Sequence, residues 1–338
     1  MNADAEEAAR RLGLDEQARA WLDEAAGLEA PGGGPHLAPP SRAREALAPL
    51  GPARADEDEI AALWPDGSWP EELMWVVGRM YARLAADLAE GRTEWRDWPV
   101  LVHSADARVR CAMPVALTAA VPPVLAEHAR WGVPAPVSAA TLADIGRHLA
   151  QTRAMFGRVG LETATWAALH FRCGLYELGR LQYEPATVRW NAPQETPGLE
   201  SESEPEPEPA RGAPVLRLHI PADGPLDPEQ VDASLARARG FFADCFGTDY
   251  RIASCSSWLL DPQLAEYLPE SSNIIAFQRR FALVGEDAPG DGDVFRFVFG
   301  MPAVDVARAP RRSRLEKAAV EHLRAGRHWR VRTGWLRL

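Results

Sequence analysis

The spacing of hydrophobic residues changes about half-way along this chain of 338 residues, and the change constrains the fold more than any other feature. Before residue 155, apolar residues recur at helical spacing, as they do from Leu73 to Leu88. After Trp166, short apolar runs alternate with turn signals, which is typical of strands separated by helices. A single hydrophobic core rarely extends past about 250–300 residues. The pattern therefore predicts an α+β protein, with a helical domain at 1–155 and a mixed α/β domain at 156–338.

The first domain contains recognisable helix boundaries. Ser68 and Glu71 have the spacing of a capping box, and Gly91 follows the last apolar residue of the same stripe. A second long helix is predicted from about Ser138, and one or two short helices within 5–27. These segments predict a domain built from helices.

An acidic tract at 193–214 lies between two strand-like segments, 180–190 and 215–220. Its Glu, Pro and Ser residues are too polar to form a core, so we expect a disordered loop that enlarges a hairpin. A linker between domains is the alternative. A strand–helix–strand unit follows, because 227–247 has helix start and stop signals and 250–260 is the next strand candidate.

The C-terminal region contains further element signals. Asp261-Pro262 predicts a helix start, and Asp291-Gly292 predicts the turn of a hairpin. The expected elements are a helix from 261, a hairpin of 283–286 with 294–299, a helix over 313–326 and a last strand over 329–336.

Composition excludes several classes of partner. The net charge is −11, of which six negative charges belong to glutamates of the acidic tract, and no basic stripe is present to bind nucleic acid. The four cysteines lie far apart without paired Cys/His spacing, which argues against zinc or disulfides. The acidic N-terminus does not resemble a signal peptide, and no apolar run approaches the ~20 residues that span a bilayer. We therefore expect a cytoplasmic protein with no metal, nucleic-acid or membrane partner.

Five stretches of the second domain occur together in a fixed order: Gly179–Glu184, Leu218–Leu226, Cys255–Pro262, Ser272–Gln278 and His322–Trp329. Together they resemble a family of bacterial acyltransferases, which combine a helical N-acyltransferase N-terminal domain with a GNAT-like C-terminal domain. The resemblance extends from about residue 135 to the C-terminus. Over the preceding residues it rests on length and helical character.

The resemblance implies a GNAT-like fold and transfer of an acyl group from acyl-CoA, as co-substrate rather than bound cofactor, to an amine of a small-molecule acceptor. GNAT enzymes hold the CoA pyrophosphate with backbone N–H groups of a [Q/R]-x-x-G-x-[G/A] loop, and this chain has no such loop. The nearest string, 237–242, has Phe where a small residue is needed. The loop 221–226 is the topological substitute: Gly224 gives close backbone access, whereas Asp223 and Asp227 repel phosphate.

Four residues are candidates for proton transfer. His219 is a candidate general base, because its ordinary pKa of ~6.5 lies near working pH. In a GNAT-like direct attack, Glu184 is the alternative base and Tyr183 the acid, while the Ser256 hydroxyl meets the leaving thiolate. Three of them also have a plainer interpretation. His219 is then a hydrogen-bonded structural residue, Glu184 part of a solvated strand face, and Ser256 a partner of neighbouring backbone.

A second group of candidates contacts donor or acceptor. Arg279 reaches a phosphate or forms a surface ion pair, and Cys255 is better explained as a small buried thiol because no base accompanies it in sequence. His328 and Trp329 begin the last strand, where a cleft edge is expected. The binding candidates are Arg180, Gln182, Gly224, Cys255, Ser257, Trp258, Asn273, Gln278, Arg279, His328 and Trp329.

Two functions from different classes remain open on the sequence. The leading one is an acyl-CoA-dependent N-acyltransferase of unspecified acceptor, supported by the polar motifs. The alternative is a non-catalytic protein that keeps a GNAT-like shape to bind a ligand or partner, supported by the missing pyrophosphate loop.

Overall fold

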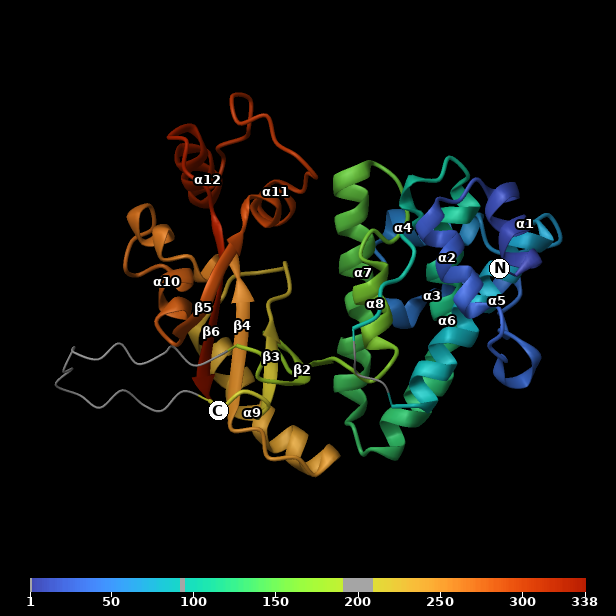
Figure 1. Ribbon diagram of the computed structural model, residues 1–338, viewed down its shortest axis with the longest axis horizontal. Helices are drawn as coiled ribbons and strands as arrows, with labels where there is room; N and C mark the ends of the chain where they lie inside the picture. The colour runs from blue at the N-terminus through green and yellow to red at the C-terminus, as the bar shows by residue number, and fades with distance from the viewer. Residues whose placement is uncertain (1, 92–94, 191–208) are drawn as a thin grey trace. The chain divides into compact units, whose positions relative to one another are not determined.

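The computed structural model describes residues 2–91, 95–190 and 209–338 (Figure 1). The chain divides into two compact units, Met1–Tyr176 and Glu177–Leu338. The sequence placed the boundary at 155, but Ala164, Ala167 and Phe171 are buried in the core of the first unit. The short helix that carries them therefore belongs to the helical unit.

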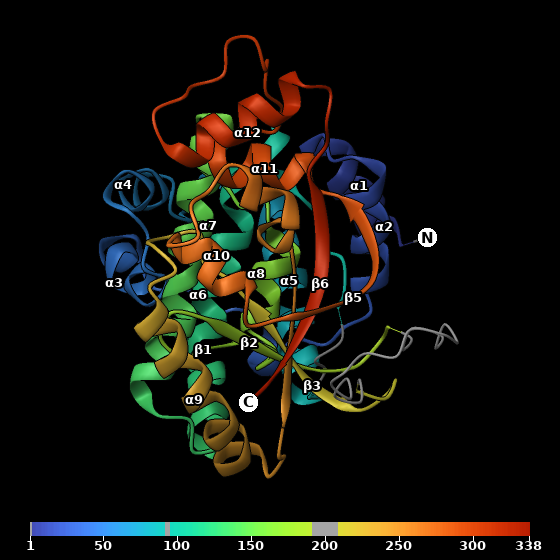
Figure 2. The ribbon, with the colours of Figure 1, turned by 90° about the vertical axis from the view of Figure 1, so that its left-hand side faces the viewer.

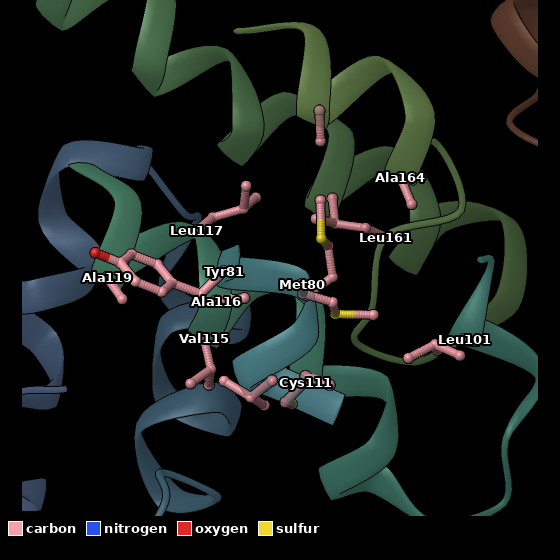
Figure 3. Close-up of a cluster of buried hydrophobic side chains, with 14 of the residues drawn as sticks. Met80, Tyr81, Leu101, Cys111, Val115, Ala116, Leu117, Ala119, Leu161 and Ala164 are labelled. Carbon is pink, nitrogen blue, oxygen red and sulfur yellow. The ribbon is translucent and has the colours of Figure 1, made fainter. Parts of the chain in front are cut away.

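The first unit is helical throughout its described residues. Its helices over Glu71–Ala89 and Ala107–Arg130 contact each other extensively, and Figure 3 shows Met80 and Tyr81 of the first beside Cys111, Val115 and Leu117 of the second. Burial of such apolar side chains, at roughly 25 cal/mol per Å², is the main favourable contribution to folding. The helices are α1 (Ala3–Leu12), α2 (Glu16–Ala25), α3 (Ala43–Leu47), α4 (Arg54–Ala62), α5 (Glu71–Ala89), α6 (Ala107–Arg130), α7 (Ala135–Phe156) and α8 (Ala164–His170), with 3₁₀ turns η1 (Pro31–Gly33), η2 (Pro40–Arg42), η3 (Ala48–Leu50) and η4 (Leu101–His103).

The predicted capping box of α5 is wrong. The Ser68 hydroxyl and amide bind the Asp66 carboxylate, at 2.6 and 2.8 Å, and Pro70 occupies the N-cap position without a side-chain bond. The Asp66 side chain forms a local turn in place of the cap. The predicted end of the helix is confirmed, because Gly91 adopts a left-handed φ of 61° one residue beyond the Glu90 C-cap.

Helix α6 has no counterpart among the helices expected from the sequence. It contains Pro114, Pro122 and Pro123, residues that disfavour a helix interior. Most of its side chains are buried inside the unit, so tertiary packing outweighs local propensity. By length and composition α6 is the one helix in the described residues that could cross a membrane, although core helices of soluble proteins meet the same criterion.

The second unit is organised around a six-stranded sheet of order β1-β2-β3-β4-β6-β5. Strands β2 and β3 form the predicted antiparallel hairpin, and α9 connects β3 to the parallel β4, as the strand–helix–strand pattern predicted. Asp227 caps α9 and Gly247 ends it, both as expected. The strands are β1 (Tyr176–Glu177), β2 (Gln182–Thr187), β3 (Pro214–His219), β4 (Ile252–Ser257), β5 (Ala282–Pro289) and β6 (Arg330–Arg337), and α9 spans Pro228–Phe246.

The segments between β4 and β6 depart from the sequence prediction in two places. The expected hairpin strand at 294–299 is helix α11 (Asp291–Phe299), and the helix expected from 261 is only the 3₁₀ turn η6 (Pro262–Glu266), which follows η5 (Trp258–Leu260). An alternating run and one amphipathic helical turn are hard to separate in a short apolar segment. Helix α12 (Arg314–Arg324) follows the prediction and begins with the expected capping box, and the short helix α10 (Asn273–Gln278) precedes β5.

Helices α11 and α12 lie at the end of the sheet where β6 begins, and the C-terminus lies at the opposite end (Figure 1, Figure 2). Of the tract predicted to be disordered, 193–208 falls outside the described residues. Its last part is ordered, because the amides of Val188 and Gly212 bind the carbonyls of Ala213 and Val188, each at 2.9 Å, and Pro214 begins β3. Backbone pairing therefore extends the hairpin beyond the expected strand.

Candidate active site

One face of the sheet carries polar side chains across four neighbouring strands. Strand register pairs Gln182 with His219, Glu184 with Arg217 and Arg217 with Ser254. Paired residues point to the same face, so these five side chains share it. Ser256 and Thr333 extend the polar face across β4 and β6. Core packing favours apolar residues, so such a row is a candidate functional surface.

His219 and Glu184 form the centre of this polar face. The Nε2 atom of His219 lies 3.0 Å from Oε2 of Glu184, and Nη1 of Arg217 donates to the other carboxylate oxygen at 3.1 Å. Glu184 is nearly buried, with 4% of its side chain exposed, whereas 27% of the His219 side chain is exposed. The Glu184 carboxylate accepts a hydrogen bond from Nε2–H, and in that tautomer the basic lone pair of the ring lies on Nδ1.

The parallel strands β3 and β4 separate beside His219. Among the described residues, their register joins Leu216 to Ala253 and Arg217 to Ser254, although the strands continue to His219 and Ser257. Ligands of open α/β sheets bind beyond the carboxyl ends of parallel strands at such a point. The point where the pairing of β3 and β4 ends therefore makes the region beside His219 a candidate binding position.

Arg180 holds the loop that follows β3. Its guanidinium donates to the carbonyls of Pro221, Gly224 and Pro225, at 3.2, 3.1 and 2.8 Å. Gly224 has a φ of +68°, a left-handed conformation that glycine adopts readily. At the end of this loop, Asp227 accepts the Gln230 amide at the N-terminus of α9. Arg180 therefore fixes the conformation of the loop that is expected from the sequence in place of the GNAT pyrophosphate motif.

Two sequence candidates face away from the polar row. The Tyr183 hydroxyl lies 3.0 Å from Oγ of Ser234 on α9, and burial raises the pKa of Tyr183. Burial also raises the pKa of Cys255, which the strand places on the same face as Tyr183, to about 12. The structure does not bring either group to the His219–Glu184 pair, so it offers no geometry for Tyr183 as the acid or Cys255 as a ligand.

The hydroxyls of β4 have distinct partners. Oγ of Ser256 lies 2.8 Å from Oγ1 of Thr333 on the polar face, and both are accessible. Oγ of Ser257 accepts the Leu259 amide at 3.1 Å and caps η5. Gln182 lies buried on the polar face, where its amide donates to Glu177 at 3.1 Å. Ser256 is thus the hydroxyl that the fold leaves available for a leaving group.

The remaining candidates have structural partners in the second unit. Gln278 donates to the carbonyls of Leu259 and Asp261, and Arg279 forms an ion pair with Glu270. Ser272 rather than Asn273 caps α10. His328 binds Asp291 at 2.6 Å, while Trp258 and Trp329 are buried in an aromatic core.

The sequence interpretation missed two contributors to the polar row. Arg217 was treated only as part of a strand, and Thr333 was not singled out. Alternation along β3 was the available signal for Arg217, because it is two residues from His219. For Thr333 no local signal exists, since only the pairing of β4 with β6 places it opposite Ser256. Among the described residues, no group of three His, Cys, Asp or Glu side chains is arranged to hold a metal ion.

Comparison with known proteins identifies the family. Residues 41–173 match the model of the N-acyltransferase N-terminal domain, and residues 175–336 match that of the GNAT-like C-terminal domain. The chain is 36% identical to a solved acyltransferase in complex with decanoyl-CoA and teicoplanin, with a TM-score of 0.86 over 99% of both chains. The chain belongs to this acyltransferase family.

Two further solved structures match over 99% of both chains with a TM-score of 0.86. One is an acyltransferase in complex with CoA and 10C-teicoplanin at 36% identity, and the other is in complex with decanoyl-CoA at 35%. No curated protein matches the chain. The predicted family, fold and activity are confirmed: this is an acyl-CoA-dependent N-acyltransferase. Of the two functions left open by the sequence, the enzyme is therefore the correct one.

Proposed function

We propose that this acyltransferase uses His219 as the general base and Glu184 as the residue that positions it. The observation that carries the proposal is the 3.0 Å contact between His219 Nε2 and Glu184 Oε2, next to the point where β3 and β4 separate. The half-exposed imidazole meets solvent and substrate, while the buried carboxylate fixes its tautomer and orientation.

The reaction follows from this arrangement as a direct attack. The acceptor amine attacks the thioester carbonyl, and Nδ1 of His219 takes the proton that the nitrogen loses. The carbon–sulfur bond then breaks, and CoA leaves as a thiolate that receives a proton from the imidazolium or through the accessible Ser256 hydroxyl. The products are an amide and CoA, and the imidazole returns to its starting form.

We further propose a glycopeptide acceptor and a medium-chain acyl donor. The support is the match over 99% of both chains to acyltransferases that bind teicoplanin, decanoyl-CoA or octanoyl-CoA. These ligands are those of the related enzymes. A cytoplasmic location stays a prediction, consistent with four free cysteines.

The proposal is tested with decanoyl-CoA and a teicoplanin-type glycopeptide that carries a free amine as substrates. His219→Ala and Glu184→Gln are each expected to lower kcat by about 10²–10⁴-fold, the usual contribution of positioned acid–base groups. The pH–rate profile separates the two roles. His219→Ala should remove the ionisation of the base from the profile, whereas Glu184→Gln should shift the pH at which that ionisation appears.

Ser256→Ala is the matched control on the same face and is expected to cost less, because water replaces a hydroxyl donor. Binding of decanoyl-CoA, followed by the rise in Tm, should survive in all three variants. Wild-type turnover in His219→Ala would exclude the imidazole as base. Binding without turnover on any glycopeptide amine would remove the proposed acceptor class.

A further inference from the structure

A second hydroxyl–imidazole–carboxylate arrangement lies in the helical unit, apart from the polar face of the sheet. Oγ1 of Thr163 lies 2.8 Å from Nδ1 of His148, and Nε2 of the same ring lies 3.2 Å from Oδ2 of Asp144. Asp144 and His148 stand one turn apart on α7, and Thr163 immediately precedes α8. The connection between the two helices thus joins the three side chains.

The partners of Asp144 define the proton positions in this group. Its carboxylate accepts from Nε of Arg147 at 2.5 Å and lies 2.8 Å from Nε2 of His170, whose Nδ1 lies 3.0 Å from the Trp166 carbonyl. Both nitrogens of His170 therefore face oxygen atoms, and the contact to Asp144 adds to the one from His148. Hydrogen bonds from His148 and His170 hold the pKa of Asp144 far below its usual range.

The Asp144 carboxylate orients the His148 ring. With Nε2–H donating to Asp144, Nδ1 is the ring atom that accepts the hydrogen bond of the Thr163 hydroxyl, which places His148 as the base of the group. A hydroxyl, a base and a carboxylate that orients the base are the elements of an activated nucleophile.

The surroundings of Thr163 suit an apolar acyl chain. The residue is half-buried rather than sealed in the core. The ring of Trp166 lies 6.4 Å from that of His148, and Trp95, which is 49% exposed, lies 5.8 Å from Trp166. The two indoles offer apolar surface that continues from solvent to the imidazole.

From this geometry we infer that Thr163 is a second acyl-accepting site, which forms an O-acyl-threonine ester from the acyl-CoA donor of the proposed function. The hydroxyl oxygen Oγ1 of Thr163 attacks the thioester carbonyl, while the hydroxyl proton passes to Nδ1 of His148. The carbon–sulfur bond breaks, and the CoA thiolate takes that proton and leaves as the thiol. Water then cleaves the ester and restores threonine, so that the site hydrolyses acyl-CoA slowly when no acceptor amine is present.

The test uses the full chain and decanoyl-CoA without acceptor, quenched in acid and analysed by intact mass and peptide mapping. The expected product carries one decanoyl group on the peptide that contains Thr163, and hydroxylamine removes it because it is an ester. The chain has a single lysine, Lys317, so acylation of a lysine would give one hydroxylamine-resistant adduct elsewhere.

Thr163→Val is expected to lose the adduct and Thr163→Ser to retain it, while His148→Gln slows its formation by about 10²–10⁴-fold. His219→Ala is the matched control, which should still form the ester although it loses transfer to an amine. Circular dichroism and Tm establish that each variant is folded.

An unmodified wild-type chain, or an adduct that persists in Thr163→Val, would overturn the inference. If the chain transfers the acyl group to an amine but never forms the ester, the inference about Thr163 is wrong and the proposed function stands. If the chain forms the ester but does not transfer the acyl group to an amine, only the proposed function is wrong.

Discussion

Adjacent residues of β4 point to opposite faces of the sheet, one buried and one polar. Cys255 is fully buried on the face with Tyr183, whereas Ser256 meets Thr333 on the polar face. A thiol with a pKa of about 12 is almost entirely protonated at neutral pH and is a poor nucleophile. The position of Cys255 within the strand, not its residue type, therefore keeps its thiol away from the polar face of the sheet.

Cys255→Ala is expected to leave turnover close to that of the wild type, because the thiol contacts no reacting group. The small cavity should lower the free energy of unfolding by roughly 1–2 kcal/mol. Steady-state kinetics measures the turnover, and urea unfolding measures the free energy of unfolding. In the native protein, Cys255 should resist alkylation by iodoacetamide. A large loss of kcat in a folded Cys255→Ala variant would contradict this assignment.

At the scale of elements, the loop after β3 is held in place by Arg180 and is predicted to contact the acyl donor. Arg180 donates to three carbonyls of this loop and thereby holds it between β3 and α9. Backbone amides at a helix start bind phosphate only when the loop keeps its conformation. A mobile loop would present these amides for a smaller fraction of the time.

Arg180→Gln should raise the KM for acyl-CoA more than it lowers kcat, since the base and its positioning carboxylate remain in place. Initial rates at varied acyl-CoA concentration give the two parameters. Arg279→Gln is the control, because Arg279 forms only an exposed ion pair with Glu270 and its loss should change KM little. An equal effect of both substitutions would refute a specific role for Arg180.

Helix α7 approaches η3 so closely that only glycine fits at one position. A Cβ added at Gly146 would lie 1.8 Å from the carbonyl oxygen of Gly51, a backbone atom that cannot move alone. Gly146→Ala is expected to destabilise the helical unit by several kcal/mol, in the range that marks severe steric change. Unfolding by denaturant measures the change in the free energy of unfolding.

Gly78→Ala in α5 is the matched control, since a Cβ there meets no atom within 4 Å. This substitution should be neutral or stabilising by up to about 1 kcal/mol, because alanine has the higher helix propensity. Equal destabilisation by the two substitutions would show that the contact between α7 and η3 is not close in solution.

At the scale of the whole molecule, each unit buries a histidine in neutral form. Burial lowers the pKa of His128 in the first unit to about 4, and burial also lowers the pKa of His322 in the second. The unfolded chain therefore binds protons at a higher pH than the folded chain does. Stability is fully present above the ordinary histidine pKa of about 6.5 and is lost as the pH falls from there.

Lowering the pH from 7 towards 4 should reduce the stability of the first unit by up to about 3 kcal/mol through His128, at about 1.36 kcal/mol per pKa unit. The measurement is urea unfolding across this pH range. His128→Gln should flatten the pH dependence relative to the wild type. An unchanged slope in that variant would mean that His128 is not the titrating group.

Much of the local structure was readable from the sequence because its signals are local. Asp227 and Gly247 bound α9, Ser313 and Glu316 form the box that opens α12, and the hairpin of β2 and β3 matches two separate apolar runs. The candidate pair His219 and Glu184 was also identified, on residue chemistry and resemblance. Its catalytic role stays a prediction, whereas its 3.0 Å contact is now established.

The sequence by itself determined the change from helices to a mixed sheet, the boundaries of α9 and α12, and the acyltransferase family. Only the tertiary structure decided which polar residues meet, because register between strands distant in sequence places Glu184 against His219 and Thr333 against Ser256. The same holds for α6, whose prolines oppose a helix locally but whose burial sustains it, and for α11, where packing selects helix over strand. Contacts between residues far apart in the chain contribute energies that no local pattern contains.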